Sequence, residues 1–376
     1  MGVVGALRGF VSREPLLSAL LLLLPVVLVV VGPVRFLGLV PRVLDVDALC
    51  LIVCLMLVSR GLELSGLLSL VAGRILGFVG GRGSLAVVVL VVVCGLSAAI
   101  VMNDASLFVY VPLARALAGI MYVGEEYLVV LMAMAANIGS SLTPIGNPQN
   151  IIIWRYSGVG FARFVSVMSW FVVPSMLLLS AYAWLLARRV GAVGRFPVPP
   201  PVRPRRGLAA VSCILLVLAV VLAEVGLQPL ALAAALTVYA LLYPEVLRGF
   251  DYALVAVFAL MFVDFGALAR ILSTLGVQVP RGGPGLYLAS VTLSQLVSNV
   301  PATILLVGLH AEWRVLALGV NVAGVGFILG SLANIIAVRL SRAGVGDYHR
   351  VALPFFVVLA ALYGLLVWAA GFPPRL

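Results

Sequence analysis

The chain has 376 residues, of which 64% are hydrophobic and only 10% are charged, and its mean hydropathy is +1.25. Soluble domains are typically about 45–50% apolar and about 25% charged, so this composition excludes a soluble globular protein and predicts a polytopic membrane protein. The net charge of +11 does not indicate a nucleic-acid partner. All basic residues are arginines that lie between apolar runs, as expected for cytoplasmic loops of a membrane protein.

The first half of the chain is expected to cross the membrane from a cytoplasmic N-terminus. Apolar runs of about 20 residues span the roughly 30 Å of hydrocarbon in a bilayer. We expect an outward span at residues 16–31 and an inward span at 47–58. A re-entrant hairpin around Asn103, an outward broken helix that ends at Ile153 and a returning span at 164–187 should follow. Residues 61–79 include Arg74 and predict an interfacial helix.

A proline-rich stretch at residues 188–207 separates the two halves and is predicted to be an extended cytoplasmic linker. It carries the densest group of basic residues, namely Arg188, Arg189, Arg195, Arg203, Arg205 and Arg206. The order of domains is then a first inverted repeat at 1–187, the linker, and a second inverted repeat with one extra span at 208–376.

The second half is predicted to repeat the elements of the first half in the opposite orientation. After the extra span at 208–222, we expect spans at 228–243 and at 251–263. A hairpin around Asn299, a broken helix that ends at Val338 and a last span after Val338 should follow. Residues 266–275 include Arg270 and predict a second interfacial helix.

Matches between the halves support this repeat. The run that begins at Asp47 resembles the run that begins at Asp251, and the interrupted run around Asn103 resembles the one around Asn299. Their order along the chain is the same in both halves. Internal repeats of opposite topology are a feature of secondary transporters.

The third match is the sharpest, because Asn137 and Asn150 are thirteen residues apart, as are Asn321 and Asn334. Gly146, Asn147 and Arg155 align in the same register with Gly330, Ser331 and Arg339. The fold class predicted from these matches is an all-α polytopic membrane protein, an inverted-repeat transporter with two re-entrant hairpins and two broken helices.

Residues 137–150, NIGSSLTPIGNPQN, place polar and helix-breaking residues inside an apolar run. Backbone opened by Pro144, Gly146 and Pro148 leaves N–H and C=O groups that lipid cannot satisfy. Such a segment is tolerated where it lines a protein-enclosed cavity, and broken helices of this kind are typical of transporter binding sites. A merely kinked structural helix is the alternative.

The first break is predicted to bind ligands at both of its helix ends. Asn147 followed by Pro148 is the N-cap and first-turn pairing of a new half-helix, whose positive dipole end attracts an anion or a polar oxyacid. The preceding half-helix ends near Ser141 and Thr143, where unpaired carbonyls suit a cation such as Na⁺. The second break, at Gly330, has no proline, and glycine-mediated helix packing remains the alternative there.

Asp104 is the carboxylate expected at a hairpin tip inside the bilayer, where an ionised Asp costs roughly 2.5–3.5 kcal/mol on insertion scales. It must therefore be paired, protonated or bound to a cation, and a proton or Na⁺ carried there would couple a gradient to transport. The alternative is that Asp104 caps the following helix. Val300 stands at the matching tip, so that Ser298 and Asn299 supply only neutral ligands there.

Other acidic residues have simpler interpretations. Asp264 lies in an apolar run and is expected to pair with Arg270. Acids placed just before apolar runs favour helix N-termini, and this group comprises Asp45, Asp47, Glu125 and Glu126. The four cysteines lack metal-type spacing and only two histidines occur, so no cofactor is expected besides a coupling ion.

These motifs resemble the ion transporter superfamily, most closely its arsenite permease, D-type sodium/proton antiporter and citrate/anion permease branch. NDASLFVYVPLARAL resembles the first hairpin tip, ANIGSSLTPIGNPQNIII the first broken helix, and SNVPATILL and GSLAN their second-half counterparts. The resemblance implies ion or substrate contacts at Asn103, Asp104, Gly146, Asn147, Asn150, Ser298, Asn299, Gly330, Ser331 and Asn334. It also implies a homodimer and an elevator motion of the domain that carries the hairpins.

The chain departs from the sodium symporters of this superfamily at both tips. Where those symporters have Ser-Asn-Thr, this chain has Met102-Asn103-Asp104 and Ser298-Asn299-Val300. The departure argues against a sodium-dicarboxylate mechanism. No arginine occurs at either tip or break, which favours a neutral or singly charged substrate.

The sequence therefore predicts a secondary active permease for a small inorganic or organic anion or an arsenite-like oxyacid, coupled to H⁺ or Na⁺. Ser141 and Thr143 join the implied contacts, and Na⁺ is expected at Asn103, Asp104 and Gly146. We expect a multi-pass protein of the cell membrane, with a cytoplasmic N-terminus and linker. An Na⁺/H⁺ antiporter that uses Asp104 as its exchange site is the alternative function.

Two further classes are disfavoured. The GVGD motif at residues 344–347 is typical of intramembrane aspartyl proteases, but here Asp347 is followed by polar residues, so we expect no enzyme. An open channel is disfavoured because two inverted half-sites suit alternating access.

Overall fold

The computed structural model of the protein describes residues 15–79, 83–121, 123–191 and 203–373. Within these ranges the regular elements are helices, which confirms the predicted all-α polytopic fold. Seven of the described helices are long and apolar enough to cross a membrane, and an N-terminal pair bent by 117° meets the same criterion together.

The N-terminal part forms four helices, α2 (Pro15–Val31), α3 (Pro33–Val43), α4 (Val46–Ser65) and α5 (Leu67–Val79). Gly32, with a φ of 84°, permits the bend between α2 and α3. Gly66, with a φ of 72°, ends α4. The predicted boundaries of an interfacial segment at 61–79 are therefore wrong, because residues 61–65 complete α4 and only the 13-residue α5 is separate.

The first hairpin, the first broken helix and a long return helix follow in the predicted order. They are α6 (Gly83–Ile100), α7 (Asn103–Met121), α8 (Glu125–Ser140), α9 (Pro148–Ser157) and α10 (Phe161–Arg189). The hairpin turns at Val101 and Met102. The backbone N–H of Met102 donates to the hydroxyl of Ser59 on α4 at 3.2 Å, which fastens the turn to that helix.

The second half begins with α11 (Arg206–Glu224), α12 (Gln228–Leu242), α13 (Pro244–Arg248) and α14 (Tyr252–Thr274). The interfacial helix predicted at 266–275 is wrong, because α14 continues through these residues as one helix of 23 residues. Gly266 lies inside α14 where Val43 of α3 packs closely against it, so this glycine provides close packing rather than a helix end.

The remaining elements complete the inverted repeat. They are α15 (Gly283–Val297), α16 (Asn299–Gly308), α17 (Trp313–Ala323), the short 3₁₀ helix η1 (Ile328–Gly330), α18 (Leu332–Arg339) and α19 (Val345–Ala370). The second hairpin turns at Ser298, which has a φ of 77°. Two hairpins and two broken helices are thus present, as predicted.

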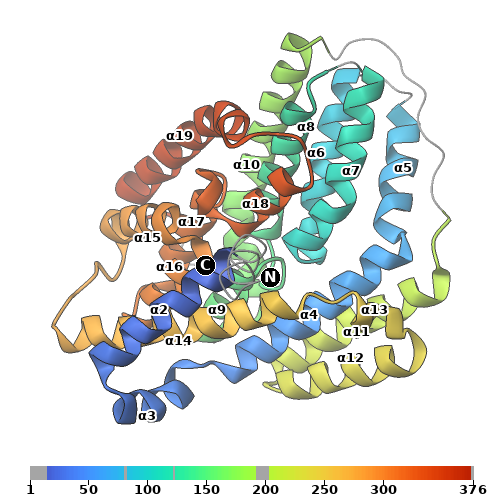
Figure 1. Ribbon diagram of the computed structural model, residues 1–376. Helices are drawn as coiled ribbons and strands as arrows, with labels where there is room; N and C mark the ends of the chain where they lie inside the picture. The colour runs from blue at the N-terminus through green and yellow to red at the C-terminus, as the bar shows by residue number, and fades with distance from the viewer. Residues whose placement is uncertain (1–14, 80–82, 122, 192–202, 374–376) are drawn as a thin grey trace, which may run out of the picture.

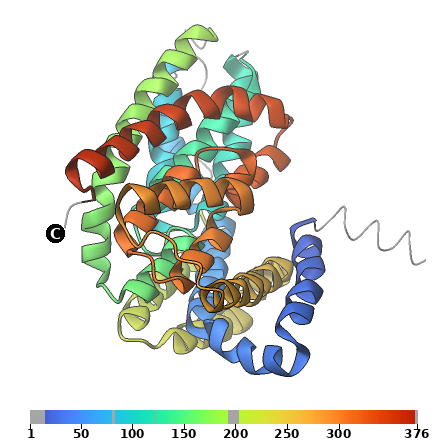
Figure 2. The ribbon, with the colours of Figure 1, turned by 90° about the vertical axis from the view of Figure 1, so that its left-hand side faces the viewer.

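Helices of the two halves pack across each other. In particular, α4 packs against α11 and α12, whereas α14 packs against α2 and α3. Figure 1 shows α4 and α14 crossing the lower part of the molecule, with α15–α19 above them on one side and α6–α8 on the other. Figure 2 shows α2 and α3 at one edge, α10 at the opposite edge, and α19 running across the upper part of the molecule. The hairpins and breaks therefore lie between two sets of long helices.

The predicted linker at 188–207 falls partly outside the described residues, and Arg195 is among those outside. At its described end, the N–H of Arg205 donates to the carbonyl of Ser65 at 2.8 Å, and its guanidinium pairs with Glu245 at 2.6 Å. These contacts bring the start of α11 to the end of α4. The division into repeats at 1–187 and 208–376 stays a prediction.

Candidate functional site

The first broken helix is shaped by its own side chains. The chain leaves α8 at Ser140 and enters α9 at Pro148 through turns. Asn147 caps α9, since its side-chain oxygen accepts the N–H of Asn150 at 2.9 Å, and Pro148 follows without an N–H to satisfy. The predicted cap and first-turn pairing is confirmed, and a half-helix N-terminus lies inside the protein.

The second break lies at the equivalent place and is formed without proline. The chain leaves α17 at Ala323, passes through η1, and enters α18 after Ser331, whose backbone is extended. The N–H of Gly330 donates to the carbonyl of Phe327 at 2.8 Å. A second broken helix is therefore confirmed, rather than a continuous helix with glycines at its packing surface.

Four asparagines join the two breaks. The amide of Asn137 donates to Asn334 at 2.7 Å, and the amide of Asn321 donates to Asn150 at 2.8 Å. All four side chains are buried. Each residue therefore bonds across to the other half, and exchanging the halves reproduces the same two bonds, as expected for inverted repeats.

The N-cap residues of the two half-helices join this network in the same reciprocal way. The hydroxyl of Ser331 donates to Asn137 at 2.9 Å, and the amide of Asn147 donates to Asn321 at 3.2 Å. We call these six residues the asparagine network, composed of Asn137, Asn147, Asn150, Asn321, Ser331 and Asn334. It fixes the position of one half-helix N-terminus relative to the other.

The asparagine network also satisfies carbonyls at the ends of α8 and α17. The amide of Asn150 donates to the carbonyls of Ser141 and Thr143 at 3.1 and 2.9 Å, and Asn334 donates to the carbonyl of Gly324 at 2.9 Å. Helix C-termini leave such carbonyls without partners. The expectation of unpaired carbonyls near Ser141 and Thr143 is therefore wrong, because side-chain amides already bond to them.

The hairpin tips and the half-helix N-termini border one small space of about 20 Å³. A space of roughly 10–15 Å³ holds one water molecule, so this one fits a single small ion or polar group. Its polar lining comes from both tips and both half-helices, through Asn103, Asp104, Gln149, Ser298, Asn299 and Ser331. We call it the polar space.

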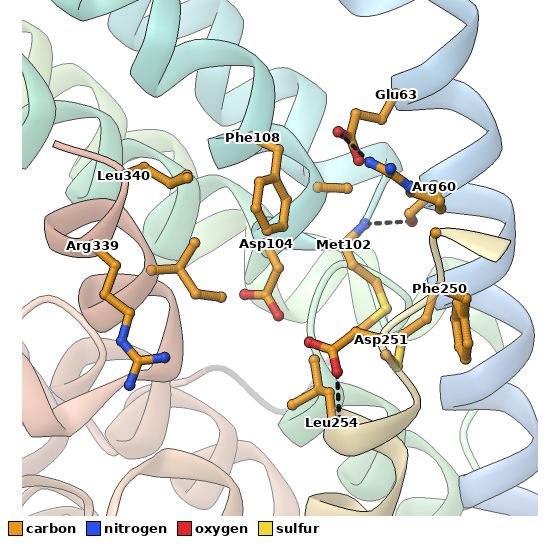
Figure 3. A pocket seen from close by; sticks show the side chains of 15 residues that line it. Arg60, Glu63, Met102, Asp104, Phe108, Phe250, Asp251, Leu254, Arg339 and Leu340 are labelled. Atoms are coloured by element: carbon orange, nitrogen blue, oxygen red, sulfur yellow. Dashed lines mark hydrogen bonds and ion pairs between the residues drawn. The ribbon is translucent and has the colours of Figure 1, made fainter. Parts of the chain in front are cut away.

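A larger cavity of about 480 Å³ adjoins the polar space at Asp104, which lines both. Its size falls within the roughly 300–1,000 Å³ of typical ligand sites. Figure 3 shows Asp104, Asp251 and Arg339 directed into the cavity. The Asp104 carboxylate has no hydrogen-bond or ion-pair partner among the described residues. It does not cap α7, because no backbone N–H of the described residues donates to it, whereas the side-chain oxygen of Asn103 accepts the N–H of Asp104 at 3.0 Å.

Three other predicted site residues do not line the polar space but form hydrogen bonds next to it, namely Ser141, Thr143 and Gly146. The hydroxyl of Thr143 donates to the carbonyl of Ala99 at 2.6 Å, and the carbonyl of Gly146 accepts the N–H of Asn103 at 2.9 Å. The hydroxyl of Ser141 donates to Asn321 at 2.9 Å. These bonds connect the first break to the first hairpin and to the asparagine network.

An Na⁺ site at Asn103, Asp104 and Gly146 stays a prediction. Asn103 and Asp104 line the polar space, whereas the carbonyl of Gly146 is bonded to the backbone of Asn103. In the part of the chain that the structure describes, no group of three His, Cys, Asp or Glu residues is placed to hold a metal ion.

The predicted set omitted residues that contribute amides to this region. Asn137 and Asn321 are not among the predicted contacts. Gln149 lines the polar space and donates to Asn321 at 3.2 Å. Gln295 of α15 accepts the N–H of Phe327 at 2.7 Å and donates to the carbonyl of Ala323 at 2.8 Å. Each is an amide side chain near a break or a tip in an otherwise apolar run, which is the signal that the sequence offers.

The predicted ion pair between Asp264 and Arg270 is wrong. Both carboxylate oxygens of Asp264 are buried without a hydrogen-bond partner, whereas Arg270 is exposed. Six residues on one α-helix turn the side chain by roughly 240°, which places the two groups on different faces of α14.

Acids that precede apolar runs also do more than favour helix N-termini. Asp45 caps α4 as predicted, accepting the N–H of Ala48 at 2.9 Å. Glu125, at the start of α8, pairs with Arg115 at 3.2 Å and accepts the N–H of Arg342 at 2.5 Å. These bonds connect α7, α8 and the loop after α18 at one end of the molecule.

Comparisons with known proteins agree with this architecture. Residues 9–312 match the family described as citrate transporter. The inner membrane protein YbiR of Escherichia coli is 33% identical over 333 residues, which cover 87% of this chain and 88% of that protein. The uncharacterized transporter MJ0456 of Methanocaldococcus jannaschii is 31% identical over 278 residues, covering 73% and 76%.

Two other similarities are more limited. The silicon efflux transporter LSI3 of Oryza sativa is 36% identical over 86 residues, covering 23% of this chain and 17% of that protein. The crystal structure of the YdaH transporter of Alcanivorax borkumensis covers 96% of this chain and 98% of that one, with a TM-score of 0.54 and 16% identity. At this identity the likeness shows the fold alone. Together, these matches confirm the resemblance to the ion transporter superfamily.

Proposed function

Because the chain belongs to the citrate transporter family, we propose that this membrane permease carries a small anion or oxyacid by secondary active transport, coupled to H⁺ or Na⁺. The transporter relatives at 33% and 31% identity support a permease rather than an enzyme. The substrate class and the coupling ion are the finer parts of the proposal.

One observation carries the proposal, namely that both hairpin tips and both half-helix N-termini border the same polar space beside a large cavity. Helix N-termini and side-chain amides donate hydrogen bonds, and they attract anions and polar oxygen atoms. Among the described residues no arginine lines the polar space itself, which favours a neutral or singly charged solute. The family's name mentions citrate, whose carboxylate oxygens such donors can bind, although citrate carries more charge than this lining favours.

Coupling is assigned to Asp104. A carboxylate without a counter-ion at this depth takes up a proton or a cation, and Asp104 borders both the polar space and the cavity. An ion binds Asp104 while this residue is exposed on one side of the membrane and leaves it on the other side. In this way the gradient of that ion drives movement of the solute.

Transport by the purified protein in proteoliposomes tests the function. Arsenite, citrate, sulfate and phosphate are offered one at a time, with an imposed Na⁺ gradient, an imposed pH gradient, or neither. We expect accumulation of at least one solute that depends on one gradient. Accumulation that is independent of both gradients would contradict secondary active transport.

A second candidate, an Na⁺/H⁺ antiporter, is supported by the same unpartnered carboxylate of Asp104. The two functions differ when no other solute is present. Only the antiporter then moves protons when Na⁺ is added, which a pH-sensitive dye inside the liposomes detects. Such a signal, together with no uptake of any oxyanion, would replace the first proposal with the second.

We expect the protein to lie in the cell membrane, with its arginine-rich end in the cytoplasm. Arg115 of α7 and Arg342 of the loop after α18 both contact Glu125, so basic residues of distant segments lie together there. Labelling of single cysteines from each side checks this orientation. The homodimer implied by the resemblance is tested by cross-linking in membranes.

A further inference from the structure

One set of ion pairs fastens the first broken helix to the N-terminus of α4. Arg155, the eighth residue of α9, contacts Asp45 at 3.2 Å and Asp47 at 3.0 Å. Both carboxylates lie at the N-terminus of α4, which Asp45 caps. The Arg155 side chain is only 24% exposed, and a partly buried arginine held by two carboxylates binds more strongly than an exposed pair.

Arg339 has the same position in the second half. It is the eighth residue of α18, and both half-helices contain Asn-Ile-Ile, at 150–152 and 334–336. The counterpart of α4 is α14, which Asp251 caps by accepting the N–H of Leu254 at 2.9 Å. The repeat therefore relates an Arg339–Asp251 pair to the observed pairs of Arg155.

These second-half partners are apart in the structure. Arg339 and Asp251 both line the cavity of about 480 Å³, and Figure 3 shows both side chains directed into it. Among the described residues Arg339 has no ion-pair partner. The other arginine of the cavity wall, Arg60, is held by Glu63 at 2.7 Å. One end of the molecule is thus fastened by its arginine, whereas the equivalent end is separated by a cavity that reaches Asp104.

We propose that Arg155 and Arg339 are matched positioning residues of the transport cycle, each closing one end of the pathway by pairing with acids at the N-terminus of α4 or α14. In this structure Arg155 holds its end closed, while the end between Arg339 and Asp251 is open. In the opposite state Arg339 pairs with Asp251, and Arg155 leaves Asp45 and Asp47. The inference rests on the proposed function in one respect. It requires that the polar space open first to one side of the membrane and then to the other.

Reciprocal pairs explain how the two end states remain close in free energy. Each state forms the carboxylate contacts of one arginine and breaks those of the other, so the electrostatic gain at one end offsets much of the loss at the other. A carrier needs such a balance, because a state that is favoured by many kcal/mol would not return.

The test reports the open end directly and needs no substrate. All four native cysteines are replaced, and Phe108→Cys, which lies on the cavity wall and is 44% exposed in the native protein, serves as the reporter. Full-length protein in membrane vesicles of both orientations is labelled with a membrane-impermeant maleimide. Arg155→Gln weakens the closed end, and we expect labelling from the cavity side to slow by about fivefold or more, a shift within the usual range of coupling energies.

Variants of the second pair are expected to act in the opposite direction. Arg339→Gln and Asp251→Asn cannot close the cavity, so labelling stays as fast as in the parent or becomes faster, while transport falls. Asp47→Asn, which leaves the α4 cap intact, should reproduce the Arg155→Gln effect in weaker form. Combining Arg339→Asp with Asp251→Arg should restore transport above the level of either single variant.

Arg350→Gln is the matched control, because Arg350 is 68% exposed and pairs with Asp347 at 3.5 Å away from the cavity wall. It should leave labelling unchanged. The proposal is overturned if Arg155→Gln does not slow labelling, or if Arg339→Gln slows it as well. A preparation that labels as expected but transports none of the tested solutes would instead contradict the proposed function alone.

Discussion

The two broken helices reach the same geometry with different residues. The first break is proline-rich and enclosed, with Asn147 and Asn150 fully buried. The second is glycine-rich and more open, with Phe327 and Leu329 exposed by 45% and 56%. In both, a side-chain amide bonds to the carbonyls that the broken helix leaves free. The two breaks therefore share the position of the amide, whereas the helix-breaking residue differs, being proline in the first break and glycine in the second.

The largest expected effect comes from removing the shared acceptor of the asparagine network. Asn321 accepts bonds from Ser141, Asn147 and Gln149 and donates to Asn150. Asn321→Ala leaves the amide of Gln149 and the side-chain oxygen of Asn150 without a partner, and it removes one of the two bonds of the Asn147 amide. Ser141 keeps its bond to the carbonyl of Asn137. The cost is roughly 1–3 kcal/mol for each unsatisfied group. We expect transport to be lost and the free energy of unfolding to fall by at least about 3 kcal/mol, measured by thermal unfolding in detergent.

Its counterpart sharpens the comparison. Asn137 accepts from Ser331 and donates to Asn334, but it lacks the additional bonds that Asn321 accepts from Ser141 and Gln149 outside the network. Asn137→Ala should destabilise the protein by about 1–3 kcal/mol. Equal losses in both variants would show that the two halves contribute alike and would contradict the ranking.

The next effect concerns the difference between the hairpin tips, where Asp104 stands opposite Val300. Asp104→Asn keeps the shape of the side chain but removes the charge and the proton site. We expect gradient-driven accumulation to disappear while the folded protein and its melting temperature are retained, because no bond of this carboxylate is lost within the described residues. Solute exchange at equilibrium, measured without gradients, is the matched assay and should persist.

Unaltered accumulation by Asp104→Asn would remove Asp104 from the coupling step. The control is Val300→Ala at the other tip, which changes packing there without affecting a charge. It should reduce the transport rate modestly and keep its dependence on the gradient.

The sequence predicted where the two helices break, but it did not predict which side chains bond across the two halves. Spacing alone predicted both breaks, because helix-breaking residues and asparagines recur at the same separation in both halves. It did not predict that Asn137 pairs with Asn334, since a bond across the pseudo-two-fold relation depends on how the repeats interlock. The expected Asp264–Arg270 pair failed for a related reason, as closeness in sequence does not put two side chains on one helix face.

The sequence also predicted two helix ends wrongly, those of α4 and α14. The sequence predicts a separate helix at residues 266–275 because Arg270 interrupts an apolar run, yet α14 continues through them and leaves that side chain exposed. Gly66 ends α4 through a left-handed backbone, whereas Gly266 is a packing contact. The same residue type at a similar place has different roles, which only the neighbouring helices decide.

A smaller effect is expected from the paired glycines, Gly146 and Gly330. A Cβ at Gly146 would overlap the backbone of Ser140, which has no room to move, whereas at Gly330 it would meet the carbonyl of Ala323 and the flexible end of Gln295. Gly146→Ala should therefore destabilise the protein by about 1–3 kcal/mol, the usual cost of overpacking. Gly330→Ala should cost less, and melting temperatures of the two variants measured side by side decide the order.

The smallest effect is expected at Thr143, whose hydroxyl donates to the carbonyl of Ala99 at 2.6 Å and so connects the first break to the first hairpin. The aligned position in the second half is Phe327, which has no hydroxyl, so this bond belongs to the first half alone. Thr143→Val keeps the shape and removes one hydrogen bond, a loss of about 0.5–1.5 kcal/mol. Thr143→Ser is the control and should retain the bond. If both variants lose the same stability, the methyl group rather than the hydroxyl connects the break to the hairpin, and the first half has no extra hydrogen-bonded connection of this kind.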